Sequence, residues 1–147
     1  MAKKSPKIQI RSVLIAEDVR HEATGQQTII GVYGNSISTA QSVLKLPRVV
    51  FRIEFISQEK IAAQCQFSVV SPSGKVVFST PQPINMEVQP GITAICSVGW
   101  SPVELTEQGH YEIRFGVDGK AKKVSSFQIN LNAEPPQNKQ LQGGASK

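Results

Sequence analysis

Apolar and polar residues alternate with a period of two along most of this chain, which is the pattern of strands that bury one face. The clearest runs are residues 49–56, 63–69, 84–89, 111–117 and 127–131. The residues on the apolar side of each run, together with the tryptophan that follows residues 92–99, are predicted to form the core: Val49, Phe51, Ile53, Phe55, Cys65, Phe67, Val69, Ile84, Met86, Trp100, Tyr111, Ile113, Phe115, Phe127 and Ile129.

Two stretches do not alternate so regularly. Residues 8–16 become apolar on both faces toward their end, which indicates either a strand buried on both sides or a strand with a bulge near Arg11 and Ser12. Residues 37–46 are the one segment in which we expect room for a short helix, which Pro47 would end.

The connections between these runs are rich in proline and glycine, as in residues 71–75, 89–91 and 118–123. About seven to nine short antiparallel strands separated by such turns predict an all-β fold, an immunoglobulin-like β-sandwich. Tyr111 follows Gly109 at the start of a strand, and this resembles a corner of immunoglobulin-like domains. In that corner the tyrosine hydroxyl bonds to an upstream backbone group.

The length of 147 residues is that of one ordinary domain, which we place at residues 8–131. We expect residues 1–7 to be a flexible tail and residues 132–147, rich in Pro, Gln, Gly and Ser, to be a disordered one. The net charge of +5 lies mostly in these tails, since residues 1–7 carry three lysines and no acid and residues 132–147 carry two lysines against one acid. The body therefore has no predicted basic face, and we do not expect nucleic-acid binding.

No stretch of the chain reads as a signal peptide or approaches the ~18 apolar residues that a membrane span needs. We therefore expect a cytoplasmic protein with no membrane partner, or a component of a virion if the chain is phage-encoded. Cys65 and Cys96 both lie on apolar strand faces, so we expect two buried, reduced thiols.

The most polar cluster of the body follows the first strand. We predict a binding surface there, in which Arg20 makes a charge-assisted contact to a partner: Glu17, Asp18, Arg20, His21 and Glu22, with Tyr33 on the next strand. The structural alternative is an internal Asp18–Arg20 or Arg20–Glu22 pair that only shapes the turn. A second alternative is a small-ligand or metal-binding domain centred on residues 17–22, although the spacing matches no established metal motif.

Catalytic signatures are missing from the sequence. It contains no Gly-x-Ser-x-Gly nucleophile motif and no glycine-rich phosphate loop. We therefore predict no catalytic residues, no cofactor and no metal. The expected function is that of a non-enzymatic protein-interaction or structural module.

Part of the chain resembles a known family. Residues 16–25 read AEDVRHEATG, residues 28–34 read TIIGVYG, and Leu46-Pro47 follows. The stretch 10–56 is similar to an uncharacterised family of small bacterial and phage proteins. That family combines an acidic-Asp-Val-Arg-x-Glu stretch with a strand of the type Ile-Gly-Val-Tyr. The resemblance implies a compact β-rich domain, supplies no activity, and is compatible with a protein partner or self-assembly in a phage or prophage context.

Overall fold

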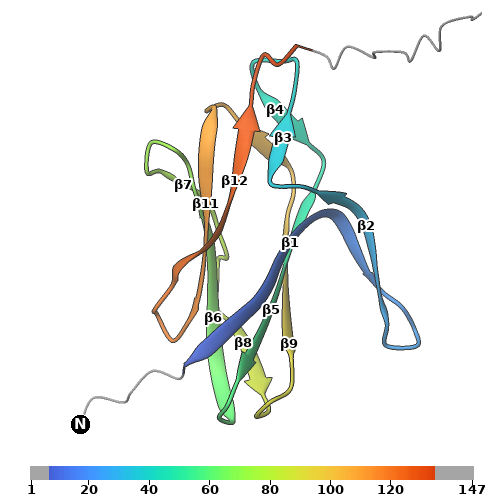
Figure 1. The fold of residues 1–147 in the computed structure, drawn as a ribbon, viewed down its shortest axis with the longest axis vertical. Coiled ribbons are helices and arrows are strands. Elements are labelled where there is room, and N and C mark those ends of the chain that lie inside the picture. The colour runs from blue at the N-terminus through green and yellow to red at the C-terminus, as the bar shows by residue number, and fades with distance from the viewer. Residues whose placement is uncertain (1–6, 135–147) are drawn as a thin grey trace, which may run out of the picture.

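The computed structural model describes residues 7–134, which form an all-β fold of twelve strands without a helix (Figure 1). The strands run in chain order: β1 (Ile8–His21), β2 (Gln27–Tyr33), β3 (Ser36–Ser38), β4 (Leu44–Leu46), β5 (Val49–Ser57), β6 (Ile61–Val70), β7 (Val76–Ser79), β8 (Ile84–Val88), β9 (Ala94–Trp100), β10 (Val103–Leu105), β11 (Gly109–Val117) and β12 (Lys122–Asn130).

Two sheets face each other across the main core. The first has the order β2-β1-β5-β9, and the second has the order β3-β12-β11-β6, in which β7 and β8 both pair with β6. Aromatic rings join the two layers, because Phe51 of β5 lies 4.9 Å from Phe67 of β6 and Phe55 of β5 lies 5.4 Å from Phe115 of β11, between ring centroids. A short pair, β4 with β10, forms a third sheet.

The predicted core is confirmed in its main features. Of the fifteen residues predicted from strand parity, twelve are buried, and the other three are partly buried and pack against the same core: Ile84, Met86 and Trp100. Period-two alternation identifies the core well because consecutive side chains of a strand point to opposite faces.

The strands are more numerous than predicted, and not all are antiparallel. Three strands of three residues each, β3, β4 and β10, add to the longer ones, and β3 runs parallel to β12. The prediction of a short helix within residues 37–46 is wrong. The segment instead contributes β3 and β4, and it buries Ile37 and Leu44 in the main core.

The predicted tyrosine corner is present. The hydroxyl of Tyr111 donates a hydrogen bond of 2.7 Å to the backbone carbonyl of Glu107, which precedes β11. This bond is a feature of immunoglobulin-like sandwiches. The immunoglobulin-like type itself stays a prediction.

Strand β1 has both properties that were predicted as alternatives. Its pairing with β5 shifts register between Ile10 and Ser12, which is the predicted bulge. Near its middle it is buried on both faces, because Ile15 belongs to the main core and Ala16 to a separate small cluster. That small cluster lies on the outer face of the first sheet, and it becomes important for the site.

The predicted tails fall almost wholly outside the described residues. β1 begins at Ile8 and β12 ends at Asn130, and residues 1–6 and 135–147 are not described. Within residues 7–134 no helix is present that could cross a membrane.

Candidate functional site

The predicted site residues lie on a two-stranded arm, which we define as residues 17–33. Residues 18–21 of β1 pair with residues 27–30 of β2, whereas the pairing of β1 with β5 ends at Ala16. Figure 1 shows this pair of strands extending away from the other strands of the fold along the second half of β1 and returning along β2.

The inner side of the arm is fixed to the outer face of the first sheet. Val19 and Ile29 of the arm pack against Ala16 and Val50, forming the small apolar cluster noted above. At the far end of the arm, the side-chain oxygen of Gln27 accepts a hydrogen bond of 2.7 Å from Nε of Arg52 on β5. The arm is therefore a packed part of the fold.

The arm contains an unusual backbone conformation at Gly31, within β2. Gly31 has a φ of +64°, in the left-handed region that residues with a side chain rarely adopt. A Cβ at this position would lie 2.6 Å from Cδ of Glu17, because the Glu17 side chain passes over the glycine. Gly31 therefore permits both the backbone conformation of β2 and the position of the Glu17 side chain.

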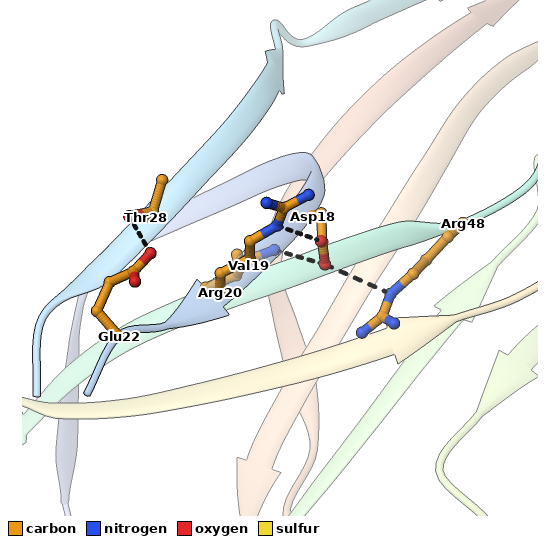
Figure 2. Close-up of polar contacts among 6 residues, drawn as sticks. All are labelled: Asp18, Val19, Arg20, Glu22, Thr28 and Arg48. Carbon is orange, nitrogen blue, oxygen red and sulfur yellow. Dashed lines mark hydrogen bonds and ion pairs between the residues drawn. The ribbon is translucent and has the colours of Figure 1, made fainter.

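Asp18 is the centre of the polar contacts on the arm (Figure 2). Its Oδ1 accepts a hydrogen bond of 3.0 Å from the backbone N–H of Val19 and lies 3.9 Å from Nε of Arg48, and its Oδ2 lies 3.4 Å from Nε of Arg20. The internal Asp18–Arg20 contact of the structural alternative is therefore present. The three side chains are 34% (Asp18), 66% (Arg20) and 53% (Arg48) exposed, so water screens these pairs.

The neighbouring polar residues make contacts across the arm. Oε1 of Glu22 accepts a hydrogen bond of 2.8 Å from the hydroxyl of Thr28, so Glu22 is engaged with β2 and not with Arg20 (Figure 2). Nδ1 of His21 lies 3.5 Å from Nε2 of Gln27. Arg20, His21 and Glu22 are all exposed. Arg20 and Glu22 share the face of the hairpin that points away from the packed cluster, whereas His21 shares the face of Val19 and is exposed near the end of β1.

Glu17 and Tyr33 lie at the base of the arm, apart from the other predicted residues. Glu17 is exposed and Tyr33 is half-buried. Burial raises the pKa of the Tyr33 phenol above its ordinary value, and the Glu17 carboxylate raises it further. The phenol is therefore neutral at physiological pH and suited to hydrogen bonding.

The metal-binding alternative lacks a set of ligands. Across residues 7–134, no three or more His, Cys, Asp or Glu side chains are grouped so that they could hold a metal ion. Asp18 already faces two guanidinium groups, and Glu22 accepts from Thr28. The arrangement is suited to polar contacts with another molecule and offers nothing specific for metal chemistry.

The two cysteines are buried and unbonded, as predicted. Burial raises the pKa of Cys65 to about 11 and that of Cys96 to about 12. Asp118 raises the pKa of Cys65 further, and Cys65 raises the pKa of Cys96 further. Both thiols are protonated at neutral pH, so neither has the thiolate character of a nucleophile.

Sequence reasoning missed the residues that hold the arm in place. The side chain of Arg52 is only 13% exposed, because it pairs with Glu54 and donates a hydrogen bond to Gln27. Hydrogen bonding from Arg52 lowers the pKa of Glu54. The Arg52–Glu54 pair could have been predicted, because the two residues are two positions apart on one strand and share a face. Nothing in the neighbouring sequence indicates the contacts of Arg48 or Gln27.

Comparison with known proteins identifies a family. Residues 11–130 match a family of unknown function, DUF6941. The chain belongs to this family. The family agrees with the expected resemblance to an uncharacterised group of proteins, whereas the proposed motif and the bacterial or phage origin stay predictions. No curated protein matches the chain.

Solved structures with a similar fold are distant in sequence. A structure of the Pseudomonas fluorescens alkylpurine DNA glycosylase AlkC, bound to DNA containing an abasic site analogue, superimposes with a TM-score of 0.50 at 9% identity, covering 85% of this chain and 31% of that one. The C-terminal domain of Wzt gives a TM-score of 0.53 at 13% identity, covering 87% of this chain and 75% of that one. This chain thus spans less than a third of the glycosylase. At such identities the likenesses concern the fold alone.

Proposed function

We propose that this chain is a non-enzymatic protein-binding or structural module and that the arm is its recognition surface. One observation carries the proposal: Arg20 and Glu22 are exposed on one face of a hairpin whose opposite face is packed against the first sheet, with His21 exposed beside them near the turn. Sandwich folds commonly bind through segments that project from a rigid scaffold.

The energetics of the arm support a role in recognition. An exposed ion pair such as Asp18–Arg20 contributes about 0–1 kcal/mol to stability. The packing of Val19 and Ile29 and the Gln27–Arg52 hydrogen bond hold the arm without help from Arg20. The Arg20 guanidinium can therefore exchange its contact with Asp18 for a contact with a partner at little cost to the fold.

The exposed chemistry favours a protein partner with both charge signs. Arg20 offers a planar cation, Glu22 a carboxylate, and β2 an exposed apolar side chain at Val32, which is 58% exposed. A second protein, or another copy of this chain, supplies complementary charges and apolar contact on that scale. We place such a module in the cytoplasm, or in a phage particle if the chain is phage-encoded.

The experiment compares the removal of two oppositely charged residues from the arm with the same removal from strand β11. On the arm the two residues are Arg20 and Glu22, which are both exposed and two positions apart; on β11 they are Arg114 and Glu112, also two positions apart, at 3.1 Å between Nη2 and Oε2. The chain is tagged in its native host and its co-purifying proteins are quantified for wild type, Arg20→Ala with Glu22→Ala, and Arg114→Ala with Glu112→Ala. We expect the arm variant to lose a partner that wild type and the β11 variant retain.

Thermal unfolding of the same variants is the control. Both double variants are expected to unfold within about 4 °C of wild type, since exposed pairs contribute little. If the arm variant retains every partner, the arm is not the recognition surface. If it unfolds far below wild type while binding per folded molecule is intact, the cluster is structural.

A further inference from the structure

A groove on the side of the sandwich between β1 and β12 is formed by strand edges that have no neighbour. β2 pairs with β1 only from Ile15 onward, so residues 8–14 have strand β5 on one side alone. β3 pairs with β12 only at Gln128–Asn130, so residues 122–127 have β11 on one side alone. Within the described residues, two strands thus present backbone donors and acceptors on the same side of the molecule (Figure 1).

A cavity of about 420 Å³ lies between the start of β1 and the hairpin that joins β11 to β12. Its apolar lining comes from Ile8 and Ile10 of β1 and from Phe115 and Val117 of β11. Three lysines complete it, Lys7 before β1 and Lys120 and Lys122 at the β11–β12 hairpin, and no acidic residue contributes to the lining. The ion pairs of residues 7–134 all use arginine, so these ammonium groups have no carboxylate partner there.

Lysines on an edge strand have a simpler explanation, because natural sheets use them to prevent edge-to-edge aggregation. The same lysines can both prevent aggregation and select a binding partner. A basic edge repels a second basic edge and attracts an acidic strand, so it discriminates between occupants. Neither terminal segment of this sequence has the acidic composition that such an occupant needs. Residues 1–6 contain two lysines, residues 135–147 contain two more, and neither segment contains an acid.

We propose that this groove, called here the β12 groove, binds an extended acidic segment of another protein by strand addition to residues 122–127 of β12. Main-chain hydrogen bonds to the edge supply affinity, and alternate side chains of the added strand supply specificity. Apolar side chains of one parity enter the cavity over Ile8, Ile10 and Val117. Acidic side chains of the added strand meet Lys120 and Lys122, which are exposed and line the same cavity. This site is separate from the arm.

The probe is a fluorescein-labelled peptide of alternating Glu and Val, seven residues long, with binding followed by fluorescence polarisation. The full chain is compared with Lys120→Glu plus Lys122→Glu, and with Lys45→Glu plus Lys75→Glu, which reverses two exposed lysines outside the cavity lining. We expect saturable binding that weakens at least about tenfold in the first variant and at most about twofold in the second. The Arg20→Ala variant is expected to bind like wild type, so this test is independent of the arm.

Strand addition is tested separately from charge attraction. An N-methylated version of the peptide, which cannot pair as a strand, is expected not to bind. Amide hydrogen exchange of residues 122–127 is expected to slow with the peptide, while exchange of β9, another edge strand, does not change. The proposal is overturned if the peptide does not bind, if the N-methylated peptide binds equally well, or if protection appears away from β12. Binding of decanoate with the same lysine dependence, without peptide binding, would assign the cavity to small amphiphiles and overturn it as well.

Discussion

Replacing Gly31 is the most informative change to the architecture of the site. Gly31→Ala places a side chain on a residue whose φ is +64°. The left-handed conformation costs a residue with a Cβ about 1–2 kcal/mol. The new Cβ would also lie 2.6 Å from Cδ of Glu17, but that carboxylate is the far end of a flexible and exposed side chain that can move away. The backbone term therefore dominates, and we expect a loss of about 1–2 kcal/mol in the free energy of unfolding.

Denaturant and thermal unfolding measure this loss, and three further variants identify its cause. The expected decrease in Tm is about 2–8 °C for a domain of this size. Gly34→Ala is the matched control, because Gly34 has no positive φ and a Cβ added to it would meet no neighbouring side chain or backbone atom within 4 Å. Gly31→Asn should cost less than Gly31→Ala, since asparagine tolerates the left-handed region. Adding Glu17→Ala to Gly31→Ala should restore only a minor part of the stability.

Either of two results would refute this explanation. A Gly31→Ala variant as stable as Gly34→Ala would show that β2 does not adopt a left-handed residue at this position. Full recovery of stability on adding Glu17→Ala would show that crowding by the Glu17 side chain, and not the backbone, makes glycine necessary.

Three other predictions concern the core. Phe115→Ala, at a fully buried side chain, should lower the free energy of unfolding by about 3–5 kcal/mol in denaturant titrations, and a loss below about 1 kcal/mol would place Phe115 outside the core. Tyr111→Phe removes the hydrogen bond to Glu107 and should lower the free energy of unfolding by about 0.5–1.5 kcal/mol. Unchanged stability would show that this hydrogen bond does not stabilise the fold. Burial raises the pKa values of Cys65 and Cys96 to about 11 and about 12, so the unfolded chain loses these protons first as pH rises. Stability should therefore decline from about pH 8.5 upward, and less so in the double Cys→Ala variant, with pH-dependent unfolding curves as the measurement.

The main core was predictable because it depends on local alternation. Phe51, Ile53 and Phe55 share one face of β5 whatever surrounds the strand, since a strand places every second side chain on the same side. The Tyr111 corner was predictable for a similar reason, because its hydrogen bond spans only four residues. Such features require no knowledge of which strands pair.

The position of the arm could not be read from alternation. Arg52 and Gln27 are 25 residues apart, and their hydrogen bond exists only because the arm turns back over the first sheet. The TIIGVY pattern predicts a strand but carries no information on the positive φ of Gly31 or on the face that the arm covers. The strands within residues 37–46 were missed because β3 is formed by its pairing with β12, which is distant in sequence.

The central claim, that the arm recognises a protein partner, is tested most directly by site-specific photo-crosslinking in the native host. A photoreactive phenylalanine analogue replaces His21, an exposed residue near the turn of the arm, or, as the matched control, Arg114, an exposed residue of β11. We predict a discrete crosslinked protein from position 21 and none of the same mass from position 114. A crosslinked partner from position 114 with none from position 21, or no crosslink at position 21 in cells that contain the folded chain, would contradict the claim.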